Sequence, residues 1–257
     1  MDKDKMYTSR LFLYAVLPLI KEIGTEYGYF AGKSGVLQLS VSLPGGEEGL
    51  HFTLDQGEVQ TALGLSPSPD VSLHFADQEH FNRFFLGKTK KMPKIKGFSR
   101  PGLLLAAFKT LLKMAALLSA KTPPKDEKTK ELVVRLYLYL LSRGISRLNL
   151  MGHEQLLAWS QASPNRVYAW QVDGCPDTAA HLRVKAGKTK ASKGRYTRSQ
   201  PFFTMRFADL DSALAILLQT GDFLTLTAQK KLILEGAPEF GAKIGDFMQL
   251  VGSYVQG

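Results

Sequence analysis

The alternation of hydrophobic and polar residues predicts β-strands in both halves of the chain. Residues 37–43 alternate strictly between aliphatic side chains and Gln or Ser. A period of two is typical of a strand in a sheet with one buried face. Shorter runs of the same kind occur at 52–54, 71–75, 182–184 and 203–207. We therefore expect at least three strands in the first half and a matching set in the second.

A period near 3.6 predicts helices around these strands. Apolar helices are expected at 9–23 and 130–144, one before each set of strands. Asp209 precedes an apolar stripe and is a suitable N-cap for a third helix. Residues 244–251 predict a terminal helix with one apolar face. The matching stretch of the first half, Gly102–Leu118, is apolar almost all round, so it is expected to be buried on every side or to face another apolar surface.

The two halves repeat the same order of motifs. His51–Gly57 and His181–Gly187 match 130 positions apart, and Val71–Asp77 matches Phe203–Asp209 at 132. A short stretch that leads to a glycine follows in each half, at 94–97 (KIKG) and 232–236 (LILEG). Landmarks that keep their order and nearly their spacing indicate an internal duplication.

The stretch 120–130 (AKTPPKDEKTK) has two prolines, alternating charge and no apolar residue after its first alanine. This composition is typical of a linker. The sequence therefore predicts two domains, 1–120 and 130–257.

The order of these elements resembles the sterol-carrier-protein type-2 family. Residues 203–217 (FTMRFADLDSALAIL) and 231–241 (KLILEGAPEFG) are closest to the family's pattern, and 69–77 and 94–97 are similar in a more diverged copy. The resemblance implies an α+β fold of two tandem domains, each a curved, mainly antiparallel sheet covered by helices around an apolar tunnel. It further implies binding of sterols, fatty acyl chains or quinone-like lipids, without a catalytic residue.

A tunnel for an acyl chain needs apolar walls and few polar anchors. In the second half the candidate wall residues are Phe203, Met205, Phe207, Leu214, Leu217, Leu218, Phe247 and Val251. In the first half they are Leu73, Phe75, Phe81, Phe84, Phe108, Leu111 and Leu112. For each of these residues, a place in an ordinary core is the alternative interpretation.

The net charge of +10 favours an anionic partner. Two runs, 88–100 and 183–198, carry cations without any acid. The candidates for contact with anionic lipid head groups are Lys88, Lys90, Lys91, Lys94, Lys96, Arg183, Lys185, Lys188 and Lys190. A solvated face is the simpler interpretation of these runs, and contact with a lipid surface is the second. Nucleic-acid binding is the third, because aromatic residues that could stack on bases are sparse in both runs.

Catalytic and metal-binding patterns are absent from the sequence. The single Cys175 cannot supply a thiolate zinc site, and no histidine lies near it in the sequence. His51 and His181 occupy equivalent positions of the repeat, which indicates a structural role. We therefore expect no enzyme, no cofactor and no metal.

The sequence thus predicts a non-catalytic protein that binds or transfers a lipid in an apolar tunnel. The partners expected are a lipid or acyl ligand and an acidic membrane surface, and dimerisation is left open. Residues 11–20 are too few to span a bilayer and lack the charge pattern of a secretory signal, so a cytoplasmic location is expected. The alternatives are a ligand-free interaction module of two pseudo-symmetric domains and non-specific nucleic-acid binding.

Overall fold

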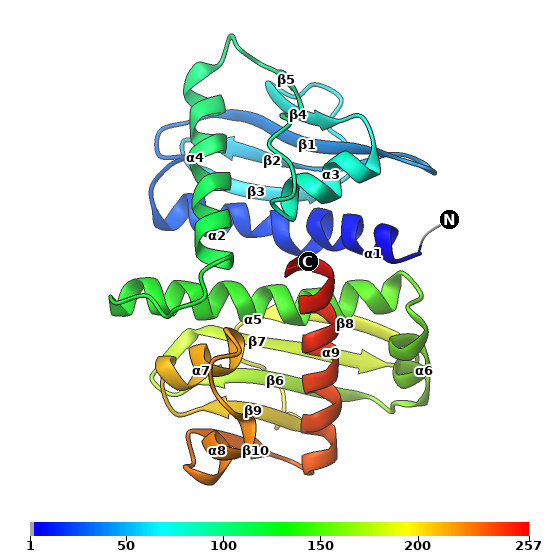
Figure 1. The fold of residues 1–257 in the computed structure, drawn as a ribbon, viewed down its shortest axis with the longest axis vertical. Coiled ribbons are helices and arrows are strands. Elements are labelled where there is room, and N and C mark those ends of the chain that lie inside the picture. Colours follow the sequence, from blue (N-terminus) through cyan, green and yellow to red (C-terminus); the bar gives the residue numbers. More distant parts are fainter. Residues whose placement is uncertain (1–2, 257) are drawn as a thin grey trace. The chain divides into compact units, whose positions relative to one another are not determined.

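A computed structural model describes residues 3–256. The chain divides into two compact units, unit 1 (Met1–Ala116 with Tyr254–Gly257) and unit 2 (Leu117–Ser253). Each unit holds one five-stranded sheet with helices packed on it (Figure 1). The fold class predicted from the sequence, α+β, is confirmed.

Unit 1 begins with a long helical segment and continues with three antiparallel strands. Its elements are α1 (Lys3–Leu11), η1 (Phe12–Val16), η2 (Leu17–Leu19), α2 (Ile20–Glu26), β1 (Gly35–Leu43), β2 (Gly46–Asp55), β3 (Glu58–Leu63), β4 (Val71–Phe75), α3 (Gln78–Phe85), β5 (Lys94–Lys96) and α4 (Pro101–Leu118).

Unit 2 repeats this order and adds two short helices. Its elements are α5 (Glu127–Leu150), α6 (Glu154–Ala162), β6 (Arg166–Val172), β7 (Cys175–Lys185), β8 (Lys188–Lys193), β9 (Phe203–Phe207), α7 (Leu210–Leu217), α8 (Phe223–Ala228), β10 (Leu232–Glu235) and α9 (Pro238–Gln256).

The two sheets have the same topology. The strand order is β3-β2-β1-β4-β5 in unit 1 and, read from the other edge, β10-β9-β6-β7-β8 in unit 2. The central pairs β1–β4 and β6–β9 are parallel, and all other pairs are antiparallel. Each sheet is thus mixed but mainly antiparallel.

The repeat extends to single turns. The β2–β3 hairpin turns at Gln56-Gly57 and the β7–β8 hairpin at Ala186-Gly187, and all four residues have positive φ. Two consecutive positive φ values are typical of a type I′ turn, which matches the twist of the flanking strands. These paired turns fix the same register in both units.

The paired histidines are structural, as their positions in the repeat predict. His51 Nδ1 lies 3.0 Å from the carbonyl oxygen of Gly64, and His181 Nδ1 lies 2.9 Å from that of Gly194. Each imidazole ties its strand to the loop that follows the third strand of the unit. The two histidines therefore hold equivalent loops against equivalent sheets.

The helix after the fourth strand is capped in the same way in both units. The Asp77 carboxylate accepts a hydrogen bond from the His80 backbone N–H, and the Asp209 carboxylate accepts one from Ser212, each at 2.7 Å. The predicted N-cap at Asp209 is confirmed. The helix that Asp209 caps ends at Leu217 and is followed by Gln219 with φ +57. Helix α8 then lies between α7 and β10, where the described part of unit 1 has no helix between α3 and β5.

The loop between α4 and α5, residues 119–126, contains the two linker prolines. Helix α4 is long and apolar enough to span a membrane by length and composition, with a mean hydropathy of 1.6. Leu103, Ala106 and Met114 of α4 are buried, but Leu105 and Leu112 are exposed. The helix is therefore not buried on every side.

In unit 1 an ion pair joins the first helical segment to the sheet. Arg10 Nε lies 3.1 Å from Glu48 Oε2, and the Tyr14 hydroxyl donates a hydrogen bond to the same oxygen at 2.7 Å. Burial alone would raise the pKa of Glu48. The hydrogen bonds from Arg10 and Tyr14, together with the charge of Arg10, outweigh it and hold that pKa below its ordinary value of 4.5.

This arrangement predicts a pH-dependent contribution to the stability of unit 1. Because the pKa is lowered in the folded state, the contribution is present above about pH 4.5 and is lost as the pH falls through the folded-state pKa. We expect Glu48→Gln to weaken protection of β2 against hydrogen exchange by about 1 kcal/mol at pH 7, and by far less at pH 3. Glu58→Gln, an exposed residue of the same hairpin, serves as the control. An equal effect of Glu48→Gln at both pH values would contradict this account.

In unit 2 a glycine allows α5 and α9 to approach closely. A Cβ atom added at Gly144 would lie 2.5 Å from Val251 Cγ1 and 2.9 Å from Cγ2. Val251 is fully buried. The position of α9 on the sheet of unit 2 thus depends on the missing side chain at Gly144.

We therefore expect Gly144→Ala to destabilise unit 2 by about 1–2 kcal/mol, because overpacking outweighs the better helix propensity of alanine. The double variant Gly144→Ala/Val251→Ala should recover much of this loss, because the clashing methyl groups are removed. Both tryptophans lie in unit 2, at 159 and 170. Urea unfolding followed by tryptophan fluorescence therefore reports on this unit. A single variant as stable as the wild type would contradict the prediction.

Candidate functional site

The register of the β6–β9 pair separates the sheet of unit 2 into two faces. Tyr168 pairs with Phe203, and Trp170 pairs with Met205. These side chains point toward the helices, and we call this side the inner face. The intervening residues Ala169 and Thr204 point to the opposite, outer face.

The predicted wall residues of unit 2 gather on the inner face. Phe203, Met205, Phe207, Leu214, Leu217, Phe247 and Val251 are buried, and Leu218 is half-buried. The seven buried residues come from β9, α7 and α9, and Leu218 directly follows α7. The structure thus brings these seven into the layer between sheet and helices, where both a core and a tunnel wall would lie.

Three aromatic residues that the sequence interpretation did not include complete this inner layer. The ring centroid of Trp159 lies 5.4 Å from that of Tyr168 and 5.0 Å from that of Phe247. The indole N–H of Trp170 donates to the sulfur of Met248 at 3.4 Å. We name this set of inner-face side chains, the predicted wall residues together with Trp159, Tyr168, Trp170 and Met248, the inner shell of unit 2.

The inner shell contains one polar atom without a partner. Tyr168 is 1% exposed, and its hydroxyl oxygen makes no hydrogen bond within the described part of the chain. Leaving a buried hydroxyl unpaired costs about 1–3 kcal/mol. In native structures such an atom calls for an explanation, and a bound molecule that accepts its proton is one.

The predicted wall residues of unit 1 differ in how deeply the structure buries them. Leu73, Phe75 and Phe81 are buried, while Phe84, Phe108 and Leu111 are half-buried. Phe75 stands at the centre of an aromatic cluster with Phe81 at 5.1 Å and Phe84 at 5.2 Å between ring centroids. Leu112 is 71% exposed, so its placement in a tunnel wall is wrong: it projects from the outward side of α4.

The predicted head-group cations fall into two groups. Lys88, Lys90 and Lys91 lie exposed in the loop after α3, and Lys94 and Lys96 lie exposed on the edge strand β5. In unit 2, Arg183 pairs with Lys190 and Lys185 with Lys188 across the β7–β8 hairpin, on the outer face. The latter four form one basic patch.

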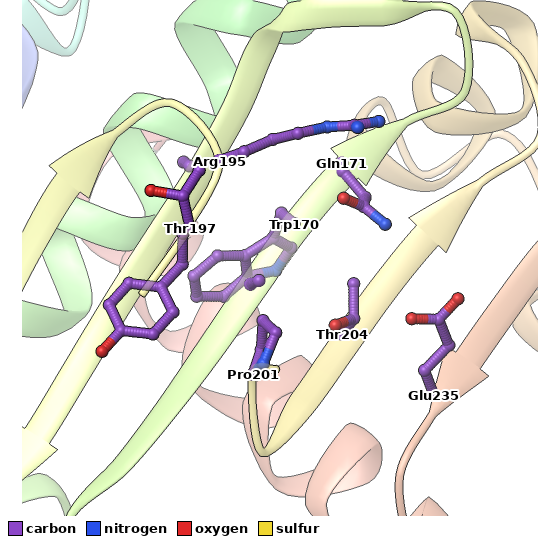
Figure 2. A pocket seen from close by; sticks show the side chains of 10 residues that line it. Trp170, Gln171, Arg195, Thr197, Pro201, Thr204 and Glu235 are labelled. Atoms are coloured by element: carbon purple, nitrogen blue, oxygen red, sulfur yellow. The ribbon is translucent and has the colours of Figure 1, made fainter. Parts of the chain in front are cut away.

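The outer face of unit 2 also carries a pocket of about 310 Å³. Its lining residues are Ala169, Trp170, Gln171, Ala180, Arg195, Tyr196, Thr197, Pro201, Thr204 and Glu235. Figure 2 shows the Arg195 side chain extended toward Gln171, with Thr204 and Glu235 on the opposite side. The segment 194–201 thus forms one wall and the strands β6, β9 and β10 form the floor. Sequence reasoning missed this pocket because its residues come from several separate segments.

One triad-like group occurs on the outer face of unit 1, but its geometry does not suit catalysis. Ser40 Oγ lies 3.0 Å from His74 Nδ1, and Glu47 Oε1 lies 3.1 Å from the same nitrogen. A catalytic relay needs the nucleophile and the acid on different ring nitrogens. Here both contact one nitrogen, so the imidazole cannot pass a proton between them.

Cys175 is half-buried in unit 2, and burial is the main cause that raises its pKa, with Glu131 and Glu127 adding to the effect. A raised pKa disfavours the nucleophilic thiolate. Among residues 3–256, the structure groups no three His, Cys, Asp or Glu side chains that could hold a metal ion.

No known family model matches the chain, and no curated protein sequence matches it. Among solved structures, a conserved hypothetical protein from Thermus thermophilus, for which a sterol carrier protein is suggested, is 14% identical. The match covers 45% of this chain and 85% of that one, with a TM-score of 0.26. The inverting sec-alkylsulfatase Pisa1 from Pseudomonas sp. is 13% identical over 59% of this chain and 28% of its own, also with a TM-score of 0.26. Likenesses this distant carry no argument about function.

Proposed function

We propose that the chain is a non-catalytic binding protein that holds a lipid or acyl chain in the inner shell of unit 2. The single observation that carries the proposal is the buried, unpartnered hydroxyl of Tyr168. An apolar chain with one oxygen acceptor, such as a carboxyl, carbonyl or hydroxyl group, would supply the missing partner. The resemblance of residues 203–217 to sterol-carrier domains supports the same ligand class.

The contrast with unit 1 supports the assignment to unit 2. Register places Leu37 and Leu39 of β1 where β6 has Tyr168 and Trp170, because each pair faces the equivalent residues of the parallel partner strand. At these two positions unit 1 thus has aliphatic side chains where unit 2 has aromatic ones. The aromatic and Met side chains of unit 2 present larger and more adaptable surfaces to a ligand.

The energetics suit a reversible carrier. Burial of an apolar chain contributes about 25 cal/mol per Å² before ordering costs are subtracted. Most inner-shell side chains are buried within unit 2, while Trp159 and Leu218 are half-buried. Ligand entry into the buried part therefore requires α7 or α9 to move from the sheet. The close contact between Gly144 and Val251 is one of the interactions that resist this movement.

The test uses 9,10-dibromostearate, whose bromine atoms quench tryptophan at short range. Trp159 and Trp170 both belong to the inner shell, so we expect saturable quenching that unbrominated stearate reverses by competition. Met205→Trp, which fills the shell, should abolish high-affinity binding if circular dichroism shows a folded protein. Absence of saturable quenching of the wild type would overturn the proposal and favour a ligand-free interaction module.

Tyr168→Phe separates a binding role from a structural one. Loss of one hydrogen bond should weaken dibromostearate binding about fivefold, whereas the ligand-free protein should keep or gain stability because an unpaired buried hydroxyl is removed. Tyr196→Phe, a phenol on the outer face, is the matched control and should change neither quantity. A Tyr168→Phe protein that is less stable without ligand and binds unchanged would show that the hydroxyl has a purely structural partner.

A further inference from the structure

The outer faces of the two sheets differ at one central position. Gln38 pairs with His51 on one side and Ser72 on the other, while Ala169 pairs with His181 and Thr204. The register therefore makes Gln38 and Ala169 equivalent. The side chain in unit 1 is a buried amide, and in unit 2 it is a methyl group.

The amide of Gln38 fills the space between sheet and loop in unit 1. Its Oε1 accepts a hydrogen bond from the Ser66 backbone N–H at 2.7 Å. In unit 2 the equivalent loop is held over the sheet by His181, whose Nδ1 contacts the Gly194 carbonyl and whose ring lies against Tyr196 at 5.2 Å. With a methyl group beneath the held loop, a pocket of about 310 Å³ remains open.

This volume is at the lower end of the range for small-molecule sites, about 300–1,000 Å³. The floor combines the apolar surface of Ala169 with the polar side chains of Gln171 and Thr204, and Pro201 adds an apolar wall. A compact organic molecule with one or two polar groups fits such a lining better than an ion alone.

The lining of the pocket holds one cation, Arg195, and one anion, Glu235. Glu235 is already held by Arg206, whose Nε lies 2.8 Å from its Oε1, and Arg206 also contacts Asp173 at 2.8 Å. Arg195 makes no ion pair or hydrogen bond within the described part of the chain. Its guanidinium is thus the group of the pocket that is available to an anion.

We propose that this outer-face pocket binds a small organic acid, with its carboxylate on Arg195 and its body against Ala169, Gln171 and Thr204. The planar guanidinium fork matches a carboxylate through two parallel hydrogen bonds. A single arginine in a largely uncharged lining suits a monoanion better than a doubly charged phosphate. Arg183 and Lys190 lie on the same outer face and add a field that attracts anions.

The floor residues Ala169, Gln171 and Thr204 alternate with inner-shell residues along β6 and β9 and point to the opposite side of the sheet, and Trp170 is the one residue common to the inner shell and the pocket lining. Failure of either proposal leaves the other standing. Stearate, added to saturation, should not displace a ligand of the outer-face pocket.

The test uses 4-(trifluoromethyl)benzoate and ¹⁹F nuclear magnetic resonance on the full chain. We expect saturable line broadening with the wild type, and at least about tenfold weaker binding of the neutral 4-(trifluoromethyl)benzamide, because hydrogen bonds to charged groups are the stronger ones. Arg195→Gln should weaken benzoate binding by a similar factor. Arg183→Gln, on the same face outside the pocket, is the matched control and should change affinity about twofold or less.

The sharpest variant is Ala169→Gln, which installs the residue that unit 1 carries at the equivalent position. The chain already tolerates glutamine in this environment, so the fold should persist and the pocket should be filled, with loss of benzoate binding. Circular dichroism and tryptophan fluorescence verify the fold. Unchanged binding by Ala169→Gln, equal effects of Arg195→Gln and Arg183→Gln, or no saturable binding by the wild type would each overturn the proposal.

Discussion

The register of the central parallel pair determines the chemistry of both faces of each sheet. In β6 and β9 the pairing of Tyr168 with Phe203 places every second residue toward the helices. A shift by one residue would exchange the inner shell for Ala169, Gln171 and their neighbours, and would expose the aromatic residues to solvent. The type I′ hairpins, whose paired positive φ values admit only one loop length, fix the register of β3 on β2 and of β8 on β7 in the same way.

Duplication with a fixed register makes the two units comparable residue by residue. Both copies retain the hairpin glycines, the loop-binding histidines and the capping aspartates. Each of these residues meets a backbone requirement that occurs in both units: a positive φ, a contact to a loop carbonyl, or a partner for an N–H at a helix start. Gln38 against Ala169 and Leu37 against Tyr168 differ in chemistry, and neither position carries one of these backbone requirements.

The sequence predicted those parts of the fold that depend on local pattern. Alternation located the strands, and Asp209 indicated the helix that it caps, because both signals act within a few residues. The parallel pairing of β1 with β4 could not be predicted in this way, since it joins segments more than 30 residues apart. Leu112 was misplaced because periodicity cannot orient a helix that is apolar on nearly every side. The outer-face pocket depends on the small side chain of Ala169, and a single alanine forms no motif that can be recognised in a sequence.

A tyrosine in the inner shell is hard to explain by stability alone. At the equivalent position unit 1 has Leu37, which is fully buried and leaves no polar atom unpaired. Phenylalanine at 168 would keep the ring contacts with Trp159 and Phe203 and avoid the cost of about 1–3 kcal/mol for an unpaired hydroxyl. Natural sequences depart from local consistency mainly at functional sites. Under the proposed function, the partner of the hydroxyl arrives with the ligand, and the inner shell of unit 2 serves as a binding surface as well as a core.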